Sequence, residues 1–159
     1  PFFALDALIS GDESEKLGKV LASYLTETEI EALSDTLLKN FSLQNVVQNL
    51  TILNADILLG YVMDAVCNLQ GLLEKQFDNR TLISFYVHLS CMVERLVTKS
   101  LMNDRVETDF EKTHSDFVQK TRNAFQEIER HYRIVLPVSE IEFLYDYIEN
   151  EEKRSKKQP

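Results

Sequence analysis

The stretch that decides the fold class is residues 82–97, which read LISFYVHLSCMVERLV. Its apolar residues recur three or four positions apart, a spacing that places them on one face of an α-helix. They are Leu82, Phe85, Tyr86, Leu89, Val93, Leu96 and Val97. The pattern predicts an amphipathic helix that follows a break at 78–80 and continues to another break around Asn103-Asp104.

The segments before this helix show the same period. Asn54 is a typical N-cap, and the apolar stripe from Leu58 to Leu73 predicts a helix directly after it. Residues 42–54 carry apolar side chains too densely for a solvated face, so we expect a short helix and a buried turn there. Further upstream, Thr26 with Glu29 three residues later forms a capping-box pattern that predicts a helix to about residue 40.

Two helices are expected after residue 104. The first covers residues 110–132, and its inward positions are Phe110, Phe117, Thr121, Phe125 and Ile128. The second follows Pro137, where Ser139 and Glu142 form another capping-box pattern, and runs through Ile148.

Length and composition support an all-α fold. The chain has 159 residues, 44% of them hydrophobic, which is enough for one domain with a core. Only 4 Gly and 3 Pro occur, which favours long helices with few turns. We predict a helical bundle of antiparallel helix pairs. It is divided into a helical linker over residues 1–26, the main domain over 27–150 and a disordered tail over 151–159.

Charge and cysteine content narrow the class of protein. The formal net charge of −9 disfavours direct contact with nucleic acid. Cys67 and Cys91 lack CxxC spacing and are interpreted as reduced thiols in or near the core, as expected in the cytoplasm. No run approaches about 18 consecutive apolar residues, so no membrane span is predicted. The chain begins with Pro1 and no initiator Met, and we expect it to be part of a longer protein.

Motifs for enzymatic chemistry are missing from the sequence. It contains no glycine-rich phosphate loop, no catalytic signature of a hydrolase or metalloprotease, and no Cys or His residues at the spacing of a zinc site. We therefore predict no enzyme activity, no cofactor and no metal.

One helix face carries chemistry. Ser84, His88, Cys91 and Arg95 are separated by four, three and four positions and so share a face beside the apolar stripe. A histidine is a nucleophile near neutral pH, and an arginine two turns away offers two hydrogen bonds to a phosphoryl group placed between them. The alternative is a structural histidine with no modification.

His114 lies between Phe110 and Phe117 on the inward face of its predicted helix. An inward imidazole needs a partner. We expect a hydrogen-bonded core histidine, with a second phosphoacceptor as the alternative. His131, near a helix end, is interpreted as a capping or dipole-compensating cation without further function.

Residues 85–96, FYVHLSCMVERL, resemble the signature helix of PTS regulation domains, in which His-Leu or His-Ile precedes Glu-Arg-Leu. Residues 42–46, 50–54 and 137–148 extend the resemblance, which is to the C-terminal regulation domain of LevR-type bacterial transcriptional activators. Residues 1–11 resemble the short join that follows a IIB-like domain in those proteins.

The resemblance implies a regulatory domain that controls a sugar operon and is phosphorylated on His88 by a protein of the phosphotransferase system, a IIB component or HPr. The DNA-binding part would lie elsewhere in the full protein. Many such domains carry a second histidine in the last helix, where this chain has Tyr147. The control site then reduces to His88, with Arg95, Ser84 and His114 in support.

Two other functions stay open. A histidine phosphotransfer module usually has a Lys-Gly pair after its histidine, and residues 89–94 contain neither residue. A purely structural dimerisation domain would keep the bundle without any phosphate. The density of apolar residues favours a homodimer in either case.

Overall fold

The computed structural model describes residues 19–99 and 109–155, with side chains described up to residue 150. Within these ranges all regular structure is helical, which confirms the all-α prediction. The principal helices are α3 (Glu27–Val47), α4 (Ala55–Leu73), α5 (Asn79–Val97), α6 (Phe110–Thr113), α7 (Ser115–Tyr132) and α8 (Val138–Ser155).

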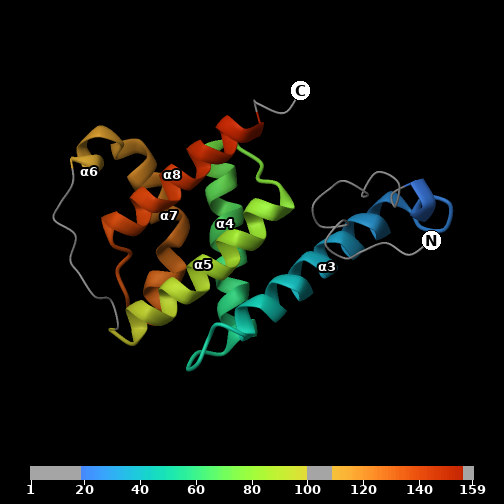
Figure 1. Ribbon diagram of the computed structural model, residues 1–159, viewed down its shortest axis with the longest axis horizontal. Helices are drawn as coiled ribbons and strands as arrows, with labels where there is room; N and C mark the ends of the chain where they lie inside the picture. The colour runs from blue at the N-terminus through green and yellow to red at the C-terminus, as the bar shows by residue number, and fades with distance from the viewer. Residues whose placement is uncertain (1–18, 100–108, 156–159) are drawn as a thin grey trace.

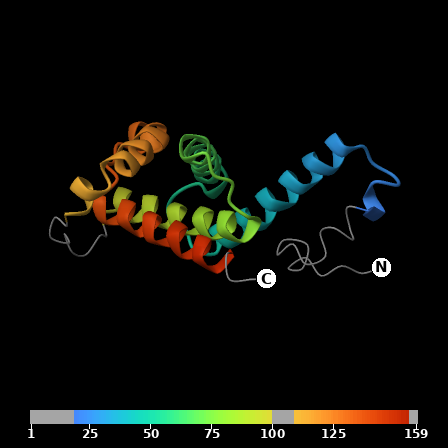
Figure 2. The same cartoon turned by 90° about the horizontal axis from the view of Figure 1, so that it is seen from above.

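The helices from α4 onward pack as antiparallel pairs in two layers, α4 with α7 and α5 with α8 (Figures 1 and 2). Tyr61 in the second turn of α4 is hydrogen-bonded to His131 at the end of α7. Similarly, Arg95 near the end of α5 contacts Glu140 in the first turn of α8. The predicted bundle of antiparallel pairs is therefore confirmed.

The core lies between the two layers, and α4 is its central helix. Helix α4 packs against α3, α5 and α7, and its buried residues are Leu58, Leu59, Val62, Ala65, Val66 and Leu69. Among the described helices α4 alone is long and apolar enough to cross a membrane, with a mean hydropathy of 1.2. Its role in the core accounts for that composition.

Helix α3 projects from the bundle (Figure 1). Only its C-terminal half is anchored, because its buried residues are Leu38, Ser42 and Val46. Its start is the predicted capping box, with Thr26 N donating to Glu29 Oε2 at 2.8 Å and Glu29 N donating to Thr26 Oγ1 at 3.4 Å. This confirms the predicted N-terminus.

The predicted end of this helix near residue 40 is wrong. Helix α3 continues without interruption to Val47, so residues 42–47 extend it instead of forming a separate short helix. No Gly or Pro occurs between residues 40 and 47 to stop it. The connector to α4 is residues 48–54, and Asn54 caps α4 as predicted, accepting from Ile57 N at 3.0 Å.

Two boundaries near the middle of the chain also differ from prediction. Helix α5 ends at Val97 and not near residue 103, and Lys99 adopts a left-handed conformation with φ 54°. Asn103-Asp104 lie outside the described residues. The expected helix over 110–132 is divided into α6 and α7 at His114, whose φ of −122° and ψ of 38° are not helical.

The last helix starts differently from the prediction. The carbonyl of Pro137 accepts from Ile141 N at 3.2 Å, so α8 begins at Val138 and Ser139 is inside the helix. The predicted capping box at Ser139 is therefore wrong. Helix α8 also continues to Ser155, so residues 151–155 are helical where a disordered tail was expected. Residues 156–159 lie outside the described residues, as does residues 1–18 of the predicted linker.

The cysteine prediction holds for one residue only. Cys91 is partly buried, whereas Cys67 is exposed. Both neighbours of Cys67 in the core stripe, Val66 and Leu69, are buried, so the thiol lies on the opposite side of α4.

Candidate functional site

Helix α5 presents two kinds of surface. It starts at Asp78, whose Oδ1 accepts from Thr81 N at 2.7 Å. One face is buried in the core through Phe85, Leu89, Met92 and Val93. His88 and Arg95 lie beside that face and turn toward α8, as the helical spacing predicts.

A carboxylate from α8 joins these two side chains. Glu140 Oε2 is 3.2 Å from His88 Nε2, and Glu140 Oε1 is 3.5 Å from an Arg95 guanidinium nitrogen. The exposed fractions of the three side chains are 26% for His88, 15% for Glu140 and 41% for Arg95. The histidine is therefore accessible at one edge, while the carboxylate between the two cations is shielded.

An aromatic ring covers one face of the imidazole. Phe143, one turn after Glu140, stacks on His88 with ring centroids 4.2 Å apart and planes 19° from parallel. Phe143 keeps 43% of its surface exposed. The first turns of α8 thus hold His88 by an edge contact and a face contact together.

The ionisation of Glu140 fixes the hydrogen-bond roles. The hydrogen bond from His88 lowers the pKa of Glu140; burial acts against this, and the charges of His88 and Arg95 lower it further. Glu140 is then ionised at neutral pH and acts only as an acceptor. Nε2 of His88 is therefore the donor, and a neutral ring carries its lone pair on Nδ1.

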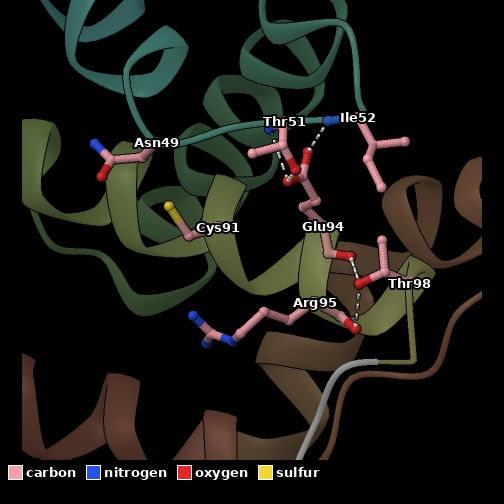
Figure 3. A pocket seen from close by; sticks show the side chains of 7 residues that line it. All are labelled: Asn49, Thr51, Ile52, Cys91, Glu94, Arg95 and Thr98. Carbon is pink, nitrogen blue, oxygen red and sulfur yellow. Dashed lines mark hydrogen bonds between the residues drawn. The ribbon is translucent and has the colours of Figure 1, made fainter.

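The residue next to Arg95 has a different task. Glu94 is buried, and its carboxylate accepts four hydrogen bonds of 2.9–3.0 Å from the α3–α4 connector. The donors are the backbone N–H groups of Thr51, Ile52 and Leu53 and the Thr51 hydroxyl. Figure 3 shows the Glu94 carboxylate directed at this backbone, while the Arg95 side chain extends away from it.

These hydrogen bonds control the charge of Glu94. Burial raises its pKa, but the four hydrogen bonds outweigh burial and lower the pKa to about 2. Glu94 is therefore a permanently ionised clamp that ties the connector to α5. Its place in the Glu-Arg-Leu pattern is explained by folding, and that of Arg95 by the contact with Glu140.

The other predicted site residues are not joined to His88. Ser84 is partly buried one turn before His88, and within the described ranges no hydrogen bond links it to His88 or Arg95. Cys91 lines an open pocket of about 350 Å³ beside Arg95 (Figure 3). Burial raises the pKa of the Cys91 thiol, which disfavours a reactive thiolate.

His114 has an aromatic environment. Its ring stacks on Phe110 with centroids 4.6 Å apart and lies 4.3 Å from the ring of Tyr145. Its Nδ1 is buried without a hydrogen-bond partner, so the expected hydrogen-bonded core histidine is not what the structure has. The described contacts of His114 reach α8 through Tyr145 and do not include His88. His131 is hydrogen-bonded through Nδ1 to the Tyr61 hydroxyl at 2.9 Å.

Comparison with known proteins identifies the fold that carries this site. A family model described as "PRD domain" matches residues 64–151, more than half of the chain. This chain belongs to the PRD family. No curated protein and no solved structure matches it. PRD domains are regulatory domains, and in general they interact with components of the phosphotransferase system.

The family match covers all the residues of the candidate site in this PRD. It begins within α4 and includes His88, Arg95 and Glu140. Helix α3 lies outside the match, although it packs against α4 and α5. The assignment of residues 27–150 to one domain stays a prediction. Among the described residues of this PRD, no group of His, Cys, Asp and Glu is arranged to hold a metal ion.

The functional residue that sequence analysis missed in this PRD is Glu140. It follows Ser139 in the closing segment 137–148, where attention went to a capping box that does not form. The only local signal is a carboxylate in the first turn of a helix, which is common for electrostatic reasons alone. Its contact with His88 spans 52 positions and arises from helix packing.

Proposed function

We propose that this PRD is the regulatory domain of a bacterial transcriptional activator of a sugar operon, controlled by phosphorylation of His88 by the phosphotransferase system. The observation that supports it best is the placement of His88 on the α5–α8 surface, partly exposed and linked through Glu140 to Arg95. The imidazole supplies a nucleophilic nitrogen near neutral pH. The arginine supplies donors for the phosphoryl oxygens.

The partners follow from the same proposal. The phosphodonor is a IIB component or HPr, which would place the domain in the cytoplasm. DNA would be bound by another part of the full protein, because a net charge of −9 disfavours contact with phosphate here. A homodimer is part of the proposal, and the exposed apolar side chains Val47, Ile52 and Ile57 near the α3–α4 connector provide apolar surface for one.

The experiment that tests this function is intact-mass analysis of the chain. The protein is incubated with phosphoenolpyruvate, enzyme I and HPr, with and without candidate IIB proteins. We expect a mass increase of one phosphoryl group that is lost after acid treatment, as for a phosphohistidine. Omission of phosphoenolpyruvate is the control. An unchanged mass with every donor would contradict the proposal and leave an unmodified helical dimerisation domain as the better description.

Replacing Arg95 by alanine should affect the modified state more than the unmodified one. Arg95 is 41% exposed and its contact with Glu140 is 3.5 Å long, so its loss should cost the unmodified protein only about 0–1 kcal/mol. In the phosphorylated state the guanidinium would face about −1.5 to −2 charges. Urea unfolding of both forms measures the difference. An equal loss of stability in both forms would argue against contact between Arg95 and the phosphoryl group.

A further inference from the structure

The space between His88 and Arg95, where a phosphoryl group is expected, already contains an anion. Each carboxylate oxygen of Glu140 contacts one of the two side chains, at 3.2 Å and 3.5 Å. Carboxylates and phosphoryl groups accept hydrogen bonds from the same partners, namely guanidinium and imidazole N–H groups. In the unmodified protein Glu140 therefore satisfies both groups that would otherwise be available to a phosphate.

We propose that Glu140 is the internal occupant of the phosphoryl site, and that phosphorylation of His88 on Nε2 displaces its carboxylate and transfers Arg95 from Glu140 to the phosphoryl group. This inference rests on the proposed function and adds to it a residue and a structural response. It makes Glu140 a positioning residue that holds His88 and Arg95 only while the imidazole is unmodified.

Geometry and charge exclude both anions from the same place. A phosphorus atom bonded to Nε2 would lie along the present hydrogen bond, closer to the ring than Glu140 Oε2 is now. The Nε2 proton that Glu140 accepts would no longer exist. The phosphoryl group would also bring about −1.5 to −2 charges against an ionised carboxylate. Glu140 loses its donor and gains a repulsive neighbour in one step.

The transfer itself also requires that Glu140 leave. In the structure Nε2 carries the proton, so that proton must first move to Nδ1 through water, which ends the hydrogen bond to Glu140. The Nε2 lone pair then attacks the phosphorus of the phosphodonor. The N–P bond forms while the bond from phosphorus to the donor's nitrogen or sulfur breaks, and the donor atom leaves with that electron pair.

The fold allows this displacement without unpacking α8. The helix is held by Ile141, Leu144 and Ile148, all buried. Glu140 lies in the first turn, beside the helix start at Val138. A change in one side-chain rotamer is therefore sufficient, and it exposes a second negative charge on the α5–α8 surface when His88 is modified.

The first test is to identify the nitrogen that is modified. The ¹⁵N-histidine-labelled chain is phosphorylated through enzyme I and HPr, and long-range ¹H–¹⁵N spectra are recorded before and after. We expect the Nε2–H tautomer before modification and phosphorus on Nε2 afterwards, with a shift of the Glu140 carboxyl ¹³C signal. Phosphorus on Nδ1 with the Nε2–H bond to Glu140 retained would overturn the displacement but leave the proposed function intact.

The second test compares phosphorylation rates of Glu140→Gln and Asp146→Asn. Both substitutions remove one negative charge from α8, but Asp146 is exposed and outside the site. We expect Glu140→Gln to accelerate phosphorylation by roughly three- to tenfold, because a neutral amide binds His88 and Arg95 more weakly than a carboxylate does. Asp146→Asn should leave the rate unchanged. An unchanged or slower rate in Glu140→Gln overturns the inference. No phosphorylation of His88 in any variant overturns the proposed function and the inference together.

Discussion

Replacing His88 by alanine is expected to abolish acid-labile phosphorylation of the chain while leaving its helix content nearly unchanged. The imidazole is the proposed acceptor and has no substitute within reach, since Tyr147 occupies the position in α8 where related domains carry another histidine. The lost packing is limited to one face contact with Phe143 and one hydrogen bond to Glu140. We therefore expect a loss of stability of only about 1 kcal/mol. Intact mass and far-ultraviolet circular dichroism measure the two effects.

His114→Ala is the matched control for this variant. It also removes an imidazole that stacks on an aromatic ring, but it leaves the α5–α8 surface untouched. Phosphorylation should persist, with some loss of stability from the cavity between Phe110 and Tyr145. Retention of the phosphoryl group in His88→Ala, or its loss in His114→Ala alone, would show that the acceptor has been assigned to the wrong residue.

Replacing Glu94 by glutamine is expected to give the largest loss of stability of any single polar substitution described here. The carboxylate accepts four hydrogen bonds from the α3–α4 connector. A glutamine would turn an N–H₂ group toward two of those donors. Since hydrogen bonds to a charged group contribute about 1.5–3 kcal/mol each and are not additive, we expect a total loss of about 2–4 kcal/mol at neutral pH. Urea unfolding measures this loss.

The pH dependence separates a charge effect from a packing effect. The pKa of Glu94 is about 2 in the folded protein, against an ordinary value of 4.5. Its contribution is fully present above the unfolded pKa and is lost as the pH falls through the folded pKa. The stability difference between wild type and Glu94→Gln should therefore be constant above about pH 5 and shrink between about pH 4.5 and 2. Glu31→Gln, exposed on α3, is the control for net charge. A difference that does not change with pH would contradict the ionised clamp.

Much of the architecture was predictable because helix formation is governed by neighbours in sequence. The caps at Thr26 and Asn54 use side chains within three residues of the groups they bind. The shared face of His88 and Arg95 follows from the helical period. Errors were confined to boundaries, such as the break at His114 and the start of α8 at Val138. There, packing or a backbone acceptor from Pro137 decided between local patterns of similar strength.

The amino-acid sequence by itself determined that this protein is an all-helical bundle with one histidine and one arginine on a common helix face. Only the tertiary structure decided what lies between them. Glu140 reaches His88 across 52 positions, and Glu94 reaches the connector across 41 to 43. Carboxylates at helix starts and in signature helices look alike in sequence. Their roles differ here because antiparallel packing of α5 and α8 directs one of them to an imidazole, whereas α5 directs the other to three backbone N–H groups.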